Sequence, residues 1–204
     1  MLIYLVRHGE TESNRLGVAL GRADVPLNEH GLWQARRLGE ALSGVSFGAI
    51  YCSPLARTKQ TAEAIAEHQS VSPVVEPGLV EMDIGEADQL PFAELRVRFT
   101  GLMEAWAGAD GPQQPMPGGE RLVDVQERAW KALMRLAGMH QDGTVCAVTH
   151  NFVILTTLAT ALGVDLAHFR RLRHGVASVS LLEVKGERIR VRQMNDACHL
   201  VEAE

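Results

Sequence analysis

The sequence has little cysteine and no excess of positive charge. Its 204 residues include only three cysteines, Cys52, Cys146 and Cys198, which lie far apart. Two of them fall inside apolar runs, where a free thiol behaves as a small hydrophobic side chain, so we expect a reducing compartment and a cytoplasmic protein. The formal net charge is −5 at pH 7. Because nucleic acids and anionic membranes are bound mainly through basic surfaces, this balance argues against both as partners.

Signals for export and for a membrane span are also missing. The chain runs from Met1 into an apolar segment that ends at Arg7, without a basic leader or a small-residue cleavage site. Residues 144–164 carry no charge and are long enough to cross a bilayer, but His150 and Asn151 lie near the middle of the segment. We interpret it as a buried strand followed by a helix and expect no membrane span.

Metal-ligand spacings are absent from the sequence as well. None of the eight histidines stands in a His-x-His or His-Glu-x-x-His pattern, and no paired aspartates lie at the end of a predicted strand. Such spacings are the usual signs of a protein metal site. We therefore expect neither a metal nor another cofactor.

Short apolar runs alternate with amphipathic segments along most of the chain. The runs predict buried strands over residues 2–6, 49–52, 74–75 and 145–149. Helices are predicted between Asn28 and Gly44, over residues 55–68, 92–106 and 122–136, directly after residue 149, and after Asp165. The expected helix caps are Asn28, Ser53 and Asp165. Residues 179–184 and 189–191 alternate around Lys185-Gly186-Glu187, which predicts a hairpin.

This alternation of strands and helices predicts the fold class. Parallel strands need helical crossovers, so we expect an α/β three-layer sandwich with a mainly parallel sheet and helices on both faces. The late hairpin adds one antiparallel edge strand. No repeat or linker divides the chain, and we predict a single domain over residues 1–204. The pattern weakens after residue 78, which suggests a cap insertion at about residues 86–119.

Cationic and nucleophilic side chains follow three of the predicted strands. Arg7 and His8 come at the end of the first, Arg57 shortly after the second, and His150 after the last. In open α/β sheets, ligands bind beyond the carboxyl ends of the strands. Two arginines and two histidines at one rim, beside helix N-termini, suit a dianion such as a phosphoryl group.

The order of these motifs resembles the histidine phosphatase superfamily, which includes the cofactor-dependent phosphoglycerate mutases. The signature is Arg7-His8-Gly9-Glu10-Thr11, followed by Asn14. The further matches, in family order, are residues 21–34, Ser53-Pro54-Leu55 with Arg57, Glu81, Pro117-Gly118-Gly119-Glu120 with Arg128, Thr149-His150, and Ala177-Ser178-Val179-Ser180. The matches extend over most of the chain.

The resemblance implies a role for each matched residue. His8 would attack phosphorus, because an imidazole with an unperturbed pKa of about 6.5 is available as a neutral nucleophile. Arg7, Arg57 and His150 would hold the non-bridging oxygens, with His150 cationic when the dianion is bound. Glu81 would protonate the leaving oxygen. This requires a raised pKa, and the sequence does not decide whether burial outweighs the pull of the arginines.

Four further residues are expected to bind substrate. Asn14 would donate a side-chain hydrogen bond, and the backbone N–H of Asn151 would supply another. Gly21 and Arg22 lie in a loop near the signature, although a salt bridge outside the site suits Arg22 equally well. We interpret two other groups structurally: the basic run at residues 170–174 as complementing a helix dipole, and the apolar stripe of residues 92–106 as a helix packing face.

The function predicted in this way is hydrolysis of a small phosphorylated metabolite. The first alternative is a cofactor-dependent phosphoglycerate mutase, which is less favoured because such mutases usually carry a longer insertion before the second histidine. A metal-dependent hydrolase lacks ligand spacing, and activity should survive a chelator. A non-catalytic phosphate-binding module would need a lost catalytic group, yet His8, Glu81 and His150 are all present.

The sequence leaves the specificity and the oligomeric state open. The phosphate ester is expected to be a small molecule, and a homodimer is compatible with the sequence. Five positions differ from the commonest family pattern, and they are Ser13, Ala87, Gln89, Asn151 and Leu155. Because the usual aromatic and arginine side chains near the pocket are missing, the natural substrate does not follow from the resemblance.

Overall fold

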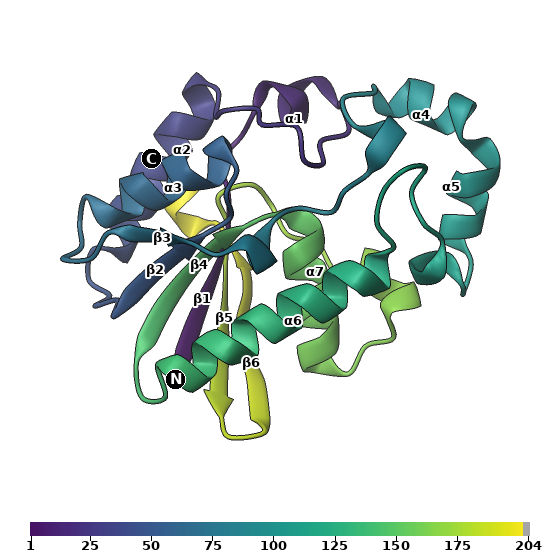
Figure 1. Cartoon of the computed structure of the whole chain (residues 1–204). Helices are drawn as coiled ribbons and strands as arrows, with labels where there is room; N and C mark the ends of the chain where they lie inside the picture. The colour runs from purple at the N-terminus through teal and green to yellow at the C-terminus, as the bar shows by residue number, and fades with distance from the viewer. Residues whose placement is uncertain (202–204) are drawn as a thin grey trace.

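The centre of the fold is a six-stranded sheet, seen in a computed structural model that describes residues 1–201 of the chain (Figure 1). The strand order is β3-β2-β4-β1-β5-β6. The strands are β1 (Leu2–Arg7), β2 (Ala49–Cys52), β3 (Pro73–Val75), β4 (Thr144–Thr149), β5 (Val179–Lys185) and β6 (Arg188–Asp196). The first four are parallel, whereas β5 runs antiparallel to both β1 and β6. The predicted sheet with an antiparallel edge is confirmed.

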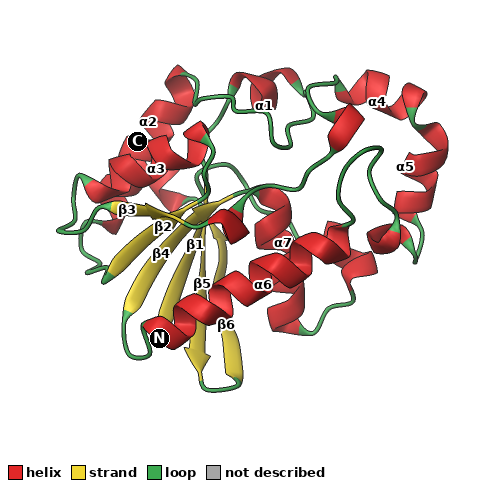
Figure 2. Cartoon of the chain, in the orientation of Figure 1, coloured by secondary structure: helices red, strands yellow, loops and turns green. Residues whose placement is uncertain are grey.

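Helices cover both faces of this sheet, as Figure 2 shows in red and yellow. The helices α6 (Leu122–Met139) and α7 (Asn151–Leu162) pack on one face, and α2 (Glu29–Leu42) and α3 (Ala56–Ala66) on the other. Successive side chains of a strand point to opposite faces, so Leu5 joins the core under α6 and α7 while Val6 joins the core under α2 and α3. The predicted three layers are confirmed.

The helix starts follow local capping rules only in part. Asn28 caps α2 by accepting a hydrogen bond from the backbone N–H of Gly31, as predicted. The prediction that Ser53 caps the next helix was wrong, because α3 begins at Ala56 with Leu55 as its cap residue. The hydroxyl of Ser53 lies 2.7 Å from Nε2 of His150 instead. A contact with a distant residue has replaced the local cap.

The segment between the third strand and α6 forms small elements away from the sheet (Figure 1). The single helix predicted over residues 92–106 is wrong in one respect: it breaks at Phe99, whose backbone is not helical, into α4 (Phe92–Arg98) and α5 (Thr100–Ala107). Backbone hydrogen bonds tie this segment to the first loop, from Gln89 to Ala19 and from Phe92 to Gly17. The segment thereby lies beside α1 (Glu12–Leu16).

The remaining elements are short. They are the 3₁₀ helices η1 (Pro77–Leu79), η2 (Gly85–Ala87), η3 (Gly111–Gln113), η4 (Leu166–Arg171) and η5 (Cys198–Leu200). Asp165 caps η4 through the N–H of Ala167, as predicted, although the helix is of the 3₁₀ type. The predicted hairpin is also confirmed, and Gly186 takes the left-handed conformation in its turn.

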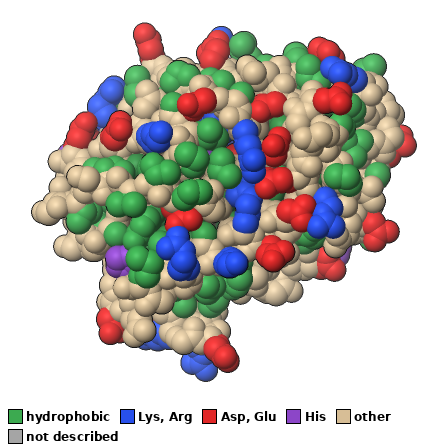
Figure 3. All heavy atoms as spheres, viewed as in Figure 1, with side chains coloured by type: hydrophobic (Ala, Val, Ile, Leu, Met, Phe, Trp, Pro, Cys, Tyr) green, Lys and Arg blue, Asp and Glu red, His purple; other side chains and the backbone are tan. Residues whose placement is uncertain are grey.

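Two expectations from the sequence concern the absence of a basic surface and of a membrane-spanning helix. The face shown in Figure 3 mixes basic and acidic side chains, with no extended basic field among the described residues drawn there. Within residues 1–201, none of the helices combines the length and the apolar character that a bilayer crossing needs. Residues 144–164 form β4 and α7, the strand and helix expected from the sequence.

Candidate active site

The predicted strand-end residues come together at the carboxyl ends of β1 and β4. Arg7 ends β1 beside Thr149 of β4, so the next residues, His8 and His150, leave the sheet side by side. Their ring centroids are 5.2 Å apart. Arg57 reaches the same place from the first turn of α3, with its Nε 3.3 Å from Nδ1 of His150. Four cationic or nucleophilic groups thus share one small volume.

The ring of His8 has a fixed protonation pattern. His8 is 4% exposed, and its Nδ1 lies 2.7 Å from the carbonyl oxygen of Gly9. A carbonyl only accepts hydrogen bonds, so Nδ1 carries the proton and Nε2 keeps its lone pair. Burial holds the pKa of His8 well below its ordinary value, and the charges of Arg57 and Arg7 lower it further. His8 is therefore a neutral imidazole with a free nucleophilic nitrogen.

The backbone beside His8 leaves no room for a side chain. A Cβ on Gly9 would lie 2.5 Å from the carbonyl oxygen of Gly31 in α2. Any other residue would push the loop away from the helix and move the carbonyl that orients His8. Glycine at this position thus keeps His8 in place.

His150 is fully buried behind His8. Its Nδ1 accepts a hydrogen bond from Nε of Arg57, so the ring proton lies on Nε2, which faces the hydroxyl of Ser53. Burial, followed by the charge of Arg57, lowers the pKa of His150 well below its ordinary value. The ring is neutral in this arrangement. A cationic His150 beside a bound dianion, as the sequence analysis expects, would require the site to take up a proton.

Arg57 is hydrogen-bonded to the loop that contains Gly21 and Ala23, and the carboxylate of Asp88 is hydrogen-bonded to the same loop. Its Nη1 and Nη2 donate to the carbonyls of Ala23 and Gly21, at 2.8 and 2.7 Å. The N–H groups of the same two residues donate to the carboxylate of Asp88, at 2.9 Å for Gly21 and 2.8 Å for Ala23. Gly21 was predicted to bind substrate, but its backbone positions Arg57. Asp88 was not predicted.

Arg7 is held from the opposite side. Its Nη1 donates to Oδ1 of Asn151 at 3.2 Å and to the carbonyl of His174. The ring nitrogens of His174 lie 2.7 Å from the hydroxyl of Ser178 and 2.9 Å from that of Ser180. Burial lowers the pKa of His174 to about 4, so this ring is neutral as well. The Nε of Arg7 is buried and has no hydrogen-bond partner among the described residues.

Glu81 is 4% exposed and accepts two backbone hydrogen bonds. Its Oε1 lies 2.8 Å from N of Met82 and its Oε2 3.3 Å from N of Phe152 at the start of α7. Burial raises the pKa of Glu81, and it outweighs these hydrogen bonds and the charges of Arg57 and Arg7, which lower it. The sequence did not decide whether burial or the nearby arginines would control the pKa of Glu81, and in the structure burial has the larger effect.

A pocket of about 820 Å³ opens beside these groups. Arg7, His8, Asn14, Glu81 and Asn151 all line it. Oδ1 of Asn14 accepts hydrogen bonds from the backbone N–H and hydroxyl of Thr11, which leaves the amide NH₂ of Asn14 as a donor. Three of the predicted phosphoryl-binding residues, Arg7, Asn14 and Asn151, thus reach the cavity from β1, α1 and α7.

Four predicted site residues lie outside the lining of this pocket, and one of them is Gly21, whose backbone holds Arg57. Arg57 and His150 are fully buried beneath it, next to His8. Arg22 is turned away and pairs with Glu120 at 3.0 Å and Asp83 at 3.5 Å. The alternative expectation for Arg22, a salt bridge outside the site, fits this position. Its Nε also lies 3.4 Å from the carbonyl of Glu81, which it helps to hold.

Two groups that we interpreted structurally turn out to line the pocket. The stripe of residues 92–106 is not only a packing face, because Phe92, Leu95 and Trp106 border the cavity. Arg170 and Arg173 of the basic run border it too. Within residues 1–201, no group of three or more His, Cys, Asp or Glu side chains is placed to hold a metal ion.

Comparison with known proteins identifies the family to which the chain belongs. A model described as "Histidine phosphatase superfamily (branch 1)" matches residues 3–197. The chain belongs to the histidine phosphatase superfamily. Phosphoserine phosphatase 1 of Hydrogenobacter thermophilus is 32% identical over 200 residues, which cover 98% of this chain and 94% of that relative. The "Probable phosphoglycerate mutase GpmB" of Proteus mirabilis is 34% identical over 184 residues, covering 89% and 84%.

A solved structure agrees with the family. Bacillus stearothermophilus YhfR superposes on this histidine phosphatase with a TM-score of 0.92 and 31% identity, covering 98% of this chain and 99% of that one. Together with the phosphatase-named relative, the family makes the protein a phosphoric monoester hydrolase. The resemblance predicted from the motifs is confirmed.

Three supporting residues of this histidine phosphatase were missed by sequence reasoning. Ser53 was matched to a family motif, but its only assigned role was that of a helix cap, and His174 was assigned to a basic run. Asp88 is one of 25 acidic residues, and nothing about its type sets it apart. The one available signal was its place between Ala87 and Gln89, two of the positions that depart from the family pattern.

Proposed function

We propose that this histidine phosphatase hydrolyses a small phosphorylated metabolite through a phosphohistidine intermediate on His8. The observation that carries the proposal is the His8 ring, which lines the pocket and whose Nδ1 is bound to the Gly9 carbonyl, leaving Nε2 as the neutral nucleophile. Nε2 attacks phosphorus, an N–P bond forms, and the P–O bond to the alcohol breaks. Glu81 gives its proton to the departing alcohol oxygen.

The second step returns the enzyme to its starting state. The Glu81 carboxylate accepts a proton from a water molecule, whose oxygen attacks phosphorus. The N–P bond breaks, its electron pair returns to Nε2 of His8, and inorganic phosphate leaves. The raised pKa of Glu81 supports both roles, because a carboxyl that titrates nearer neutrality exchanges a proton readily in either direction.

The other buried groups stabilise the transferring phosphoryl group. Arg7 and Arg57 lie beside His8 before any substrate arrives, so their positive charge is in place for the transfer, whereas the neutral His150 adds a charge only when the site takes up a proton. Asn14 and the backbone N–H of Asn151 supply further hydrogen bonds from the pocket wall. Residues 86–119 serve as a cap over this site within a single domain. No metal takes part in either step.

The test is hydrolysis of 4-nitrophenyl phosphate by the purified chain. His8→Ala should lower the rate by about 10³-fold or more, because the nucleophile is removed. The matched control is His168→Ala, an exposed histidine of η4, which should leave the rate unchanged. Activity should also survive a chelator. Full activity in His8→Ala, or its loss on chelation, would refute the proposal.

A phosphoglycerate mutase is the second candidate, and the 34% identity to the Proteus mirabilis relative favours it. A mutase returns the phosphoryl group to the organic product, whereas a phosphatase gives it to water. Adding 3-phosphoglycerate with and without 2,3-bisphosphoglycerate distinguishes them. Phosphate release without isomer exchange supports the phosphatase, and rapid exchange with little release supports the mutase.

A further inference from the structure

The pocket changes character away from the phosphoryl site. At the His8 end it is lined by charged and amide groups, but beyond them the walls are apolar. Four of the wall residues come from the cap segment and two from α7, namely Phe92, Leu95, Met103, Trp106, Phe152 and Leu155. A phosphoryl group fills only a small part of a cavity of about 820 Å³, so the apolar part must receive the alcohol that the phosphate esterifies.

Three aromatic rings form the firmest part of this wall. Phe152 lies 6.1 Å from Trp106 and 6.1 Å from Phe169 between ring centroids, and Trp106 lies 6.3 Å from Phe169. The indole N–H of Trp106 donates to the carbonyl of Gln114, which fixes the ring. Trp106 meets the other two rings edge to face, and such contacts hold the rings in place and offer their surfaces to another aromatic group.

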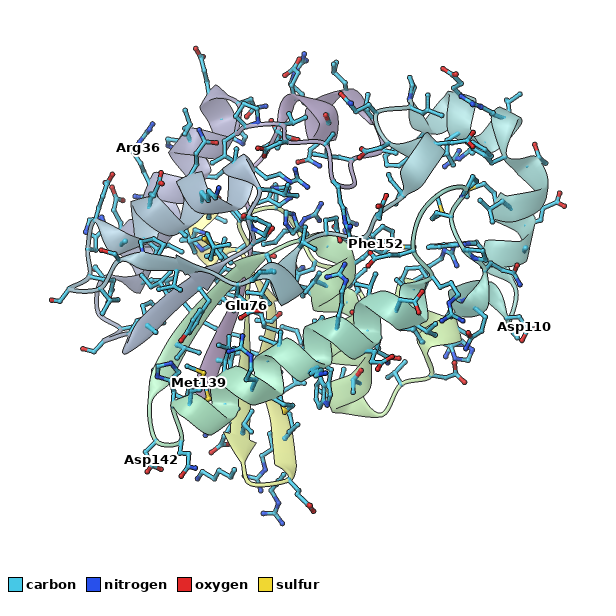
Figure 4. All side chains as sticks on the ribbon, in the orientation of Figure 1. Arg36, Glu76, Asp110, Met139, Asp142 and Phe152 are labelled. Atoms are coloured by element: carbon cyan, nitrogen blue, oxygen red, sulfur yellow. The ribbon has the colours of Figure 1, made fainter. Side chains whose placement is uncertain are left out.

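The aromatic wall begins at the proton donor itself. The backbone N–H of Phe152 donates to Oε2 of Glu81, and the Phe152 side chain lines the pocket. Figure 4 labels Phe152 at the start of α7, between the sheet and the cap helices. An ester oxygen that takes its proton from Glu81 therefore places its organic group against this ring. The wall is continuous with the reaction site.

The charged side chains that line this region are exposed or hydrogen-bonded to protein groups, and none of them lies within the apolar wall itself. Arg170 lies over the ring of Phe169, with 4.7 Å from Cζ to the centroid, and donates to the carbonyl of Trp106. Glu10 accepts a hydrogen bond from Asn28. Arg173, which is exposed, is the one further arginine of the lining besides Arg7 and Arg170 among the described residues. A carboxylate or ammonium group placed against the apolar wall would lose its hydration without a partner.

We propose that the alcohol of the natural substrate is bulky and apolar and carries an aromatic ring, which binds against Phe152, Trp106 and the cap. This inference rests on the proposed function and narrows its substrate class. It places small zwitterionic or carboxylate esters, such as phosphoserine and phosphoglycerate, among the poor substrates. Phe152 and Met103 act as specificity-determining residues.

The test compares primary alkyl phosphates of similar intrinsic reactivity, so that size and polarity alone vary. These are ethyl, butyl, 2-phenylethyl and 2-(1-naphthyl)ethyl phosphate, with phosphoserine and 3-phosphoglycerate as polar members. We expect kcat/KM to rise by about 100-fold or more from ethyl to 2-phenylethyl phosphate, since apolar pockets discriminate about 10-fold or more per added methylene. The polar esters should fall near ethyl phosphate.

Substitutions in the apolar wall test whether it causes the expected preference for large apolar esters. Phe152→Ala should lower the ratio of kcat/KM for 2-(1-naphthyl)ethyl over ethyl phosphate by about 10-fold or more. Met103→Gln should lower the same ratio. It provides the test if the Phe152→Ala protein does not fold. The control is Val97→Ala in α4, because this residue is 79% exposed and lies outside the pocket.

Two outcomes separate failure of this inference from failure of the proposed function. The apolar substrate class would be overturned if kcat/KM were the same for all the alkyl phosphates. It would also be overturned by a preference for phosphoserine or 3-phosphoglycerate that Arg173→Ala removes. Either result would leave His8-dependent hydrolysis intact. Absence of any His8-dependent hydrolysis, 4-nitrophenyl phosphate included, would instead overturn the proposed function and the inference with it.

Discussion

At the scale of single residues, two shifted pKa values make the proposed chemistry compatible with one pH. The reaction needs His8 neutral and Glu81 protonated together. With ordinary pKa values of about 6.5 for histidine and about 4.3 for glutamic acid, the carboxyl would lose its proton before the imidazole became neutral. Burial lowers the pKa of His8 and raises that of Glu81, which moves both toward the required order.

The first prediction concerns the acid. In Glu81→Gln, kcat/KM for an alkyl phosphate should fall by about 10²- to 10⁴-fold, because an alkoxide leaves poorly without a proton. The loss should be smaller for 4-nitrophenyl phosphate, whose leaving group is stable as an anion. In the unaltered enzyme, kcat/KM for the alkyl ester should fall as the pH rises through the pKa of Glu81, and the variant should lack this limb.

Steady-state rates of both esters across a pH series provide the measurement. Glu86→Gln is the matched control, since Glu86 is an exposed carboxylate paired with Arg98 outside the pocket. Equal losses on the two esters would show that Glu81 positions other groups and is not the proton donor.

The second prediction concerns backbone strain. Gln89 has a φ of 65°, a left-handed conformation in which a side chain costs about 1 kcal/mol or more and glycine is free of that cost. Gln89→Gly should therefore raise the free energy of unfolding by a few tenths to about 1 kcal/mol, measured by urea denaturation. Glu127→Gly, in the exposed face of α6, should lower it by about 1 kcal/mol.

At the scale of elements, the sequence predicted what depends on local periodicity. The parallel strands, α2 with its Asn28 cap, α6 and the hairpin around Gly186 follow from apolar spacing and turn residues, and the structure has them. Features that depend on distant contacts were not predictable. Ser53 binds His150 across 97 residues instead of capping α3, and the helix break at Phe99 has no proline beside it, while the neighbouring Gly101 lies inside α5.

The third prediction concerns the loop that clamps Arg57. Asp88 binds the N–H groups of Gly21 and Ala23, whose carbonyls accept from the guanidinium, so the carboxylate positions Arg57 without touching substrate. Asp88→Ala should weaken inhibition by orthovanadate by about 10- to 100-fold, as loss of a supporting hydrogen-bond partner does at other preorganised sites. Asp110→Ala, in an exposed part of the cap, serves as the control.

Competition between vanadate and 4-nitrophenyl phosphate gives the inhibition constants. Asp88→Asn should be intermediate, because an amide keeps one acceptor oxygen. Unchanged vanadate inhibition in a folded Asp88→Ala protein would mean that Arg57 holds its position without the clamp.

At the scale of the whole molecule, the sheet gathers the proposed phosphoryl site, and residues of the proposed cap line the rest of the pocket. Arg7, His8 and His150 were predicted to meet because parallel strands end at one rim, and the structure places them together. The apolar wall was not predicted as a wall, because residues 92–106 look like any packed helix until the fold sets Trp106 against Phe152. Local sequence patterns therefore predict the end of the pocket proposed to carry out the reaction. The end proposed to select the alcohol depends on tertiary contacts.

The most direct test is to quench the enzyme during turnover of 4-nitrophenyl phosphate and locate the phosphoryl group by mass spectrometry. The mechanism predicts one phosphorylated residue, His8, with no such species in His8→Ala. Rapid hydrolysis that leaves His8 unmodified at every quench time, or a phosphoryl group on another residue, would contradict it.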